Sequence, residues 1–136
     1  MKVIIDTNVF ISGVFFSGPP SKILEAWRDG KVQLVVSREI LQEYQHVLET
    51  MEEEFTGVDV SEILELFTVK SELIAAPALI KAVCVDPDDD KFLACALASK
   101  VKHIISGDKH LLKVSGYRGV EVVKPRKFID NYIREV

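Results

Sequence analysis

The chain has 136 residues, of which 48% are hydrophobic and 28% charged, and its formal net charge at pH 7 is −4. This composition excludes a disordered chain, and the length predicts one domain over residues 1–136 whose core needs no disulfide or metal to hold it. No apolar run is long enough to span a membrane, and Asp6 interrupts the first one too early for a signal peptide, so we expect a soluble cytoplasmic protein.

The predicted elements begin with a strand. Residues Val3–Ile5 form an apolar run that is too short for a helix and typical of a strand buried in a parallel sheet. The segment Val9–Pro20 is rich in Phe, Gly, Ser and Pro and predicts a loop. A helix is expected to begin at the N-cap Ser21 and to end at Asp29-Gly30, with Trp27 in the core.

The middle of the chain predicts a strand, two helices and another strand. Val32–Val36 is the strand, and Ser37 is expected to cap a helix whose apolar residues recur at helical spacing. A second helix is expected over about Val60–Leu73. A short strand is then expected around Ala82–Val85.

The last part of the chain continues the alternation of strands and helices. The expected elements are a polar turn at Asp86–Asp90, a buried helix over Lys91–Lys100, a strand over His103–Ser106, a short helix through Leu111 and Leu112, a strand over Val120–Val123 and a closing helix from Pro125. This order predicts an α/β fold of three α/β/α layers around a mainly parallel sheet of four or five strands. The cysteines Cys84 and Cys95 are expected to be buried free thiols, as in a reducing cytoplasm.

The charges are divided unevenly along the chain. Between Glu39 and Asp90 there are fourteen acids and two lysines, whereas between Lys91 and Lys127 there are nine Lys or Arg and two acids. Such a division can produce a face that binds polyanions, or simply two solvated faces of opposite sign.

Four acids stand where such a sheet could bring them together. Asp6 and Asp108 each follow a predicted strand, Asp90 opens the buried helix, and Glu43 borders the apolar stripe of its own helix. In open α/β sheets, ligands bind outside the carboxyl ends of the strands. Each acid taken alone also has an ordinary interpretation as a turn residue, helix cap or surface charge.

Carboxylates that are brought together repel one another, so they either take up protons or bind a cation. An all-oxygen cluster without His or Cys suits Mg²⁺ or Mn²⁺. One or two such ions can activate a water molecule and stabilise the leaving oxygen in phosphodiester cleavage.

The segments around these acids together resemble the PIN-domain family. They are Asp6-Thr7-Asn8, Glu43 within Ile40–Leu48, Asp90 within Asp86–Ala96, and Asp108 within Ile105–Leu112. The resemblance extends from Lys2 to about Pro125. It implies a PIN-like (Rossmann-like) fold and a metal-dependent endoribonuclease that cleaves single-stranded RNA, often as the toxin of a toxin–antitoxin pair.

The resemblance also implies roles for individual residues. The catalytic, metal-binding acids would be Asp6, Glu43, Asp90 and Asp108, with Glu43 orienting the attacking water or a second ion. Asp88 and Asp89 are further candidates for the third acid, and Asp90 is preferred for its distance to the apolar helix. The supporting polar residues would be Asn8 and Ser106. Their position near the acids makes Lys91, Lys109 and Lys113 candidate contacts to the RNA backbone.

The sequence leaves the partners of the protein and two alternative functions open. The family often forms homodimers, and its toxins are blocked by an antitoxin protein. The residues Phe10, Val14, Phe15 and Phe16 could form such a surface or belong to the core. The alternative functions are a non-catalytic RNA- or partner-binding domain and a receiver-like phosphotransfer domain in which Asp6 accepts the phosphoryl group.

Overall fold

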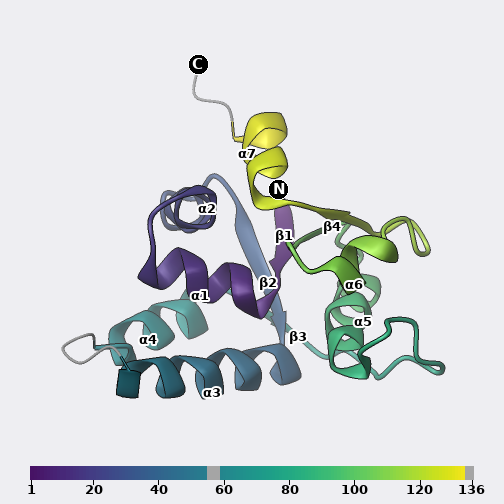
Figure 1. Cartoon of the computed structure of the whole chain (residues 1–136), viewed down its shortest axis with the longest axis horizontal. Helices are drawn as coiled ribbons and strands as arrows, with labels where there is room; N and C mark the ends of the chain where they lie inside the picture. Colours follow the sequence, from purple (N-terminus) through teal and green to yellow (C-terminus); the bar gives the residue numbers. More distant parts are fainter. Residues whose placement is uncertain (55–58, 134–136) are drawn as a thin grey trace.

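A parallel five-stranded sheet forms the centre of the computed structural model, which describes residues 1–54 and 59–133 (Figure 1). The strands are β1 (Lys2–Ile5), β2 (Gln33–Ser37), β3 (Glu72–Ile74), β4 (His103–Ile105) and β5 (Glu121–Val123). Their order is β3-β2-β1-β4-β5, and every neighbouring pair is parallel. This result confirms the predicted α/β fold.

Helices cover both faces of the sheet and make the three layers. They are α1 (Thr7–Phe15), α2 (Pro19–Arg28), α3 (Arg38–Glu54), α4 (Ser61–Lys70), α5 (Asp90–Ser99), α6 (Lys109–Lys113) and α7 (Pro125–Tyr132), with a 3₁₀ turn at Pro87–Asp89. In Figure 1 the helices α1 to α4 lie on one side of the strands, and α5 and α6 lie on the other. Because the chain passes from β3 back across the sheet to β4, a right-handed crossover requires this change of side.

An aromatic cluster joins the helices of the first layer. The ring of Phe10 stacks on Tyr44 at 4.4 Å between centroids, and Phe67 meets Phe10 edge-on at 4.6 Å. Trp27, which the sequence placed in the core, is buried and lies 5.2 Å from Phe67. These contacts tie α1, α2, α3 and α4 into one body.

The predicted loop over Val9–Pro20 is wrong, because most of this segment is the helix α1. Asp6 caps that helix: its Oδ1 accepts the N–H of Val9 at 2.7 Å. Phe and Val are weak helix formers, but here burial of one face against the core outweighs propensity. The next helix begins at Pro19 after Gly18 rather than at the predicted cap Ser21.

The predicted strand at Ala82–Val85 is also wrong. The described residues there form no strand. The strand that the sequence did not predict is β3, which overlaps the end of the predicted helix Val60–Leu73. That helix ends at Lys70, and β3 then pairs with the edge of β2. A three-residue strand that is only partly buried has no alternating pattern by which the sequence could reveal it.

The remaining expectations agree with the structure to within a few residues. Ser37 caps α3 through a 3.3 Å hydrogen bond from the N–H of Ile40. Both cysteines are buried and free. None of the helices within the described residues combines the length and the apolar character that crossing a membrane requires.

The aromatic residues of α1 and its end are split between core and surface. Phe10 is fully buried and Phe16 is 54% exposed, whereas Val14 and Phe15 pack partly against the core.

We expect Phe10→Ala to lower the free energy of unfolding by about 3–5 kcal/mol, since it leaves a cavity in the aromatic cluster. Val69→Ala, at a residue of α4 that is 78% exposed, is the control and should change it by less than about 1 kcal/mol in urea denaturation. Equal effects would contradict the placement of α1.

Candidate active site

The acidic site lies at the carboxyl edge of the sheet, between β1 and β4. These central strands are neighbours, and the chain leaves them toward opposite edges of the sheet. Such a switch point leaves a crevice outside the strand ends, the usual ligand site of an open α/β sheet. The N–H of Asp6 donates to the carbonyl of Ile105 at 3.1 Å, which sets the two strand ends side by side.

Asp6 is a buried carboxylate, 4% exposed, at the centre of this crevice. Its Oδ1 caps α1, and its Oδ2 accepts a hydrogen bond from the hydroxyl of Ser106. Burial raises the pKa of Asp6, although these two hydrogen bonds oppose the increase. The carboxylates of Asp108 and Glu43 raise it further. Asp6 is thus enclosed by the protein, with both of its carboxylate oxygens engaged.

Asp108 stands beside Asp6 and is linked to it through Ser106. The N–H of Asp108 donates to the Ser106 hydroxyl at 2.9 Å, so Ser106 connects the ends of the two acidic segments. The Asp108 carboxylate also caps α6, accepting the N–H of His110 at 2.7 Å. The ordinary role as a helix cap therefore coexists with a place in the acidic crevice.

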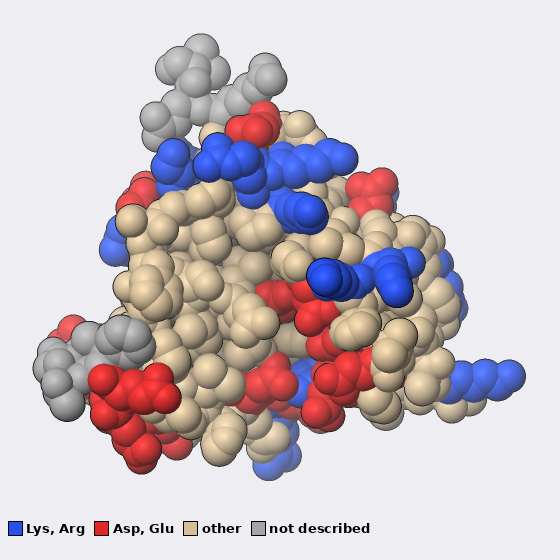
Figure 2. Space-filling view, in the orientation of Figure 1, with Lys and Arg blue, Asp and Glu red and all other residues tan. Residues whose placement is uncertain are grey.

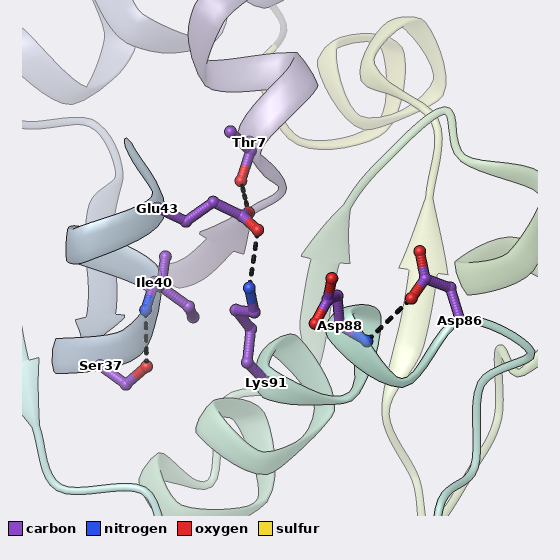
Figure 3. Close-up of polar contacts among 7 residues, drawn as sticks. All are labelled: Thr7, Ser37, Ile40, Glu43, Asp86, Asp88 and Lys91. Atoms are coloured by element: carbon purple, nitrogen blue, oxygen red, sulfur yellow. Dashed lines mark hydrogen bonds and ion pairs between the residues drawn. The ribbon is translucent and has the colours of Figure 1, made fainter. Parts of the chain in front are cut away.

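Glu43 is held from two sides at the border of the crevice (Figure 3). The hydroxyl of Thr7, from the start of α1, donates to its Oε2. The Nζ of Lys91, from the start of α5, lies 2.6 Å from its Oε1. This pair leaves the Lys91 and Glu43 side chains only 21% and 29% exposed. In this arrangement Lys91 is engaged with an acid rather than presented to RNA.

Asp90, the expected third acid, is bound by the backbone of the segment that precedes α5. Its carboxylate accepts the N–H of Cys84 at 2.8 Å and that of Val83 at 3.1 Å. Burial acts to raise the pKa of Asp90, but these hydrogen bonds prevail and hold it below the ordinary value. This carboxylate therefore fastens the segment that precedes α5, and its role as the third acid stays a prediction.

Asp89, the neighbouring candidate for the third acid, responds electrostatically to the crevice acids. Burial and the carboxylate of Asp108 raise the pKa of Asp89 to about 6. Asp86 and Asp6 add to this increase, and the nearby His110 opposes it. Asp89 therefore lies in the field of the crevice acids. Asp88, the third member of the run, is exposed, and its N–H binds the side chain of Asp86 (Figure 3).

The donor chemistry of the crevice fits a hard divalent cation. Its side chains offer carboxylate and hydroxyl oxygens, the ligands that Mg²⁺ and Mn²⁺ prefer. The raised pKa values of Asp6 and Asp89 indicate negative charge that the protein leaves uncompensated. Within residues 1–54 and 59–133, no three His, Cys, Asp or Glu side chains converge closely enough to hold an ion as they stand.

Sequence reasoning missed two polar side chains of the site. Thr7 was overlooked because α1 was taken for a loop, although it directly follows Asp6. His110 lies near Asp89, and its buried Nδ1 has no hydrogen-bond partner among the described residues. The expected support residue Asn8 is exposed on α1, and within the described residues its side chain makes no hydrogen bond to Asp6.

Comparison with known proteins agrees with this fold. The family model of the PIN domain matches residues 2–110 of the chain. The chain belongs to the PIN-domain family. The matched range contains all the acids of the crevice, from Asp6 to Asp108.

Two further likenesses extend over nearly the whole PIN domain. The uncharacterized protein MJ1680 of Methanocaldococcus jannaschii is 34% identical over 145 aligned residues, which cover 97% of this chain and 92% of that protein. A chain in the crystal structure of VapBC2 from Rickettsia felis, bound to a DNA fragment from their promoter, matches with a TM-score of 0.59 and 12% identity. That match covers 91% of this chain and 98% of the other, and at such identity it shows the shared fold alone.

The opposite pKa shifts of Asp89 and Asp90 predict opposite effects of pH on two variants. Folded Asp89 holds its proton up to about pH 6, above its unfolded value, so it costs stability as pH rises from 4 to 7. In EDTA, the melting temperature of Asp89→Asn should therefore rise relative to that of wild type as the pH increases over that range.

Asp90 has a lowered pKa, so the stability that its charged form contributes is present at pH 7 and lost in acid. Asp90→Asn should lose about 1 kcal/mol at pH 7 and less near pH 3. The same trend in both variants would contradict our assignment.

The ion pair at Glu43 predicts how Lys91 affects cation binding. Lys91→Met leaves the Glu43 carboxylate without its cation, so the crevice gains uncompensated negative charge. We expect Mn²⁺ to bind this variant about tenfold more tightly and to raise its melting temperature more than that of wild type. Lys109→Met is a matched control, because Lys109 is exposed and makes no ion pair within the described residues. An unchanged or weaker response to Mn²⁺ in Lys91→Met would refute the prediction.

Proposed function

We propose that this PIN domain is a Mg²⁺- or Mn²⁺-dependent endoribonuclease that cleaves single-stranded RNA. The observation that carries the proposal is that Ser106 links Asp6 and Asp108 at the edge between β1 and β4, where Asp108 raises the pKa of both Asp6 and Asp89. Carboxylates that repel one another are stabilised by a bound cation, and at a ligand crevice such a cation can act on the ligand. Membership of the PIN-domain family adds support, because PIN domains are generally nucleases.

In this proposal Asp6, Asp89 and Asp108 are the ligands of the main ion. When bound, the ion supplies an activated water and neutralises charge on the phosphate. Asp89 is placed here in the role that the sequence assigned to Asp90, because Asp108 and Asp6 act on the pKa of Asp89, whereas burial and the bonds to Cys84 and Val83 determine that of Asp90. Ser106 fixes the orientation of the Asp6 carboxylate by donating to Oδ2.

Glu43 is placed to orient the attacking water or a second ion. Thr7 and Lys91 hold its two carboxylate oxygens, which restricts the rotation of the side chain. A restrained carboxylate can accept a proton from water with less loss of conformational freedom than a free one. Thr7 and Lys91 are therefore positioning residues in this scheme.

We further propose that the chain is the toxin of a toxin–antitoxin pair, with an antitoxin protein as partner and a homodimer as its working form. The family resemblance supports the toxin role, and the fold shared with VapBC2, seen with a DNA fragment from their promoter, is compatible with it. Phe16, Ile80 and Val85 are exposed apolar residues on which such partners could be placed. Light scattering on the purified chain tests the dimer: a mass equal to one chain would rule it out.

Cleavage of a labelled single-stranded RNA in Mn²⁺ tests the enzyme. We expect Asp6→Asn and Asp89→Asn to cut at least about 100-fold more slowly than wild type, because each removes a ligand charge. Glu43→Gln should lose about 100-fold through the proton transfer. Asp90→Asn is the matched control and should retain most activity at 25 °C, provided that its fold is verified by circular dichroism. Equal cleavage by wild type and Asp6→Asn would show that the activity does not come from this crevice.

A second candidate function is a non-catalytic RNA- or partner-binding domain. Two observations favour it: Asp6 and Asp108 both serve as helix caps, and the described side chains do not already converge on an ion. The response to Mn²⁺ separates the two functions. An ion that fills the crevice raises the melting temperature by mass action, whereas a non-catalytic domain shows no such increase.

A further inference from the structure

Basic side chains flank the acidic crevice on the face shown in Figure 2. The acids appear near the centre of this face, and Lys and Arg gather over α7 and over α6 beside them. The exposed basic residues of these two elements are Lys109 and Lys113 on α6, and Lys124, Arg126 and Lys127 at the start of α7. An acidic centre between basic margins is the charge pattern that a polyanion needs in order to approach carboxylates.

The basic residues at the start of α7 have no acidic partner. Within the described residues, Lys124, Arg126 and Lys127 make no ion pair and no side-chain hydrogen bond. Lys2 and Lys91, in contrast, are each paired with a glutamate. The positive charge of the α7 start is therefore available to an outside ligand.

Lys124 and Lys127 line a separate hollow beside β5. A groove begins at the first residue of α7, next to Lys124 in the chain, and reaches the acids at Asp108. It has a volume of about 300 Å³, and its lining includes Asn8, Ser12, Gly107, Asp108 and Pro125. Asp108 belongs to the crevice, and Pro125 is the first residue of α7. At Gly107 there is open space where a side chain would stand, and Asn8 and Ser12 provide polar groups along the way.

We propose that Lys124, Arg126 and Lys127 form, with this groove, a binding track for the sugar–phosphate backbone of single-stranded RNA. We call this surface the α7 track. It rests on the proposed function and goes beyond the expected contacts on α6, because it assigns the approach of the RNA to the other margin of the acids. Backbone phosphates are held by the three cations, and the strand passes through the groove to Asp108 and Asp6. Such contacts set position and affinity and carry no sequence preference.

Fluorescence anisotropy with a labelled twelve-nucleotide single-stranded RNA tests the track. The measurement is made in EDTA, so that binding is observed without cleavage. The track variant carries Lys124→Gln, Arg126→Gln and Lys127→Gln. The matched control carries Arg28→Gln, Lys31→Gln and Lys102→Gln, exposed residues near the amino ends of the strands and thus at the opposite edge of the sheet. Both variants change the net charge equally.

We expect the track variant to bind at least about tenfold more weakly at 100 mM KCl, and its dependence of log Kd on log salt to fall by about 2, since three phosphate contacts are lost. The control should change Kd less than about twofold. Equal weakening in both variants, or no weakening in the track variant, would overturn the proposal. If the triple variant unfolds, the single variant Arg126→Gln is measured against Arg28→Gln, and the loss of one phosphate contact is expected to lower the salt dependence by about 0.7. A chain that binds RNA through the track but never cuts it would refute the nuclease and leave the track standing.

Discussion

The buried carboxylate of Asp6 is the constraint on which the site and much of the fold depend. A charge with so little exposure is costly unless hydrogen bonds replace its water, and Val9 and Ser106 provide them. The first of these bonds starts α1, and the second joins the ends of β1 and β4. One side chain therefore begins a helix, fixes the central strands and places a negative charge at the ligand edge. Stability and chemistry cannot be separated at this position.

Around Asp6 the protein compensates some acids and leaves others uncompensated. Lys91 forms an ion pair with Glu43, which also accepts a hydrogen bond from Thr7. Backbone N–H groups donate hydrogen bonds to Asp90. Asp6 and Asp89 have raised pKa values, chiefly through burial, and the carboxylate of Asp108 adds to both increases. The compensated acids organise the border of the crevice, whereas the uncompensated ones give it affinity for positive charge.

The predictions from sequence succeeded where a local pattern and a physical rule coincide. Short apolar runs followed by acids revealed β1 and β4, and the 3.6-residue pattern revealed α3. They failed where tertiary contacts decide. The helix α1 is stabilised by burial of Phe10 on Tyr44, and β3 is defined only by its pairing with β2. Among Asp88, Asp89 and Asp90, spacing could not separate neighbours, because the choice depends on a backbone segment, Val83–Cys84, that captures one of them.

The bond between Asp6 and Ser106 joins residues that are one hundred positions apart in the chain. Loops of that size close late in folding, after local helices and the neighbouring β1–β2 pair can already form. While the polypeptide emerges from a ribosome, its first ninety residues hold Asp6 and Glu43 but neither Ser106 nor Asp108. The acidic crevice is therefore complete only after β4 has left the exit tunnel and joined β1.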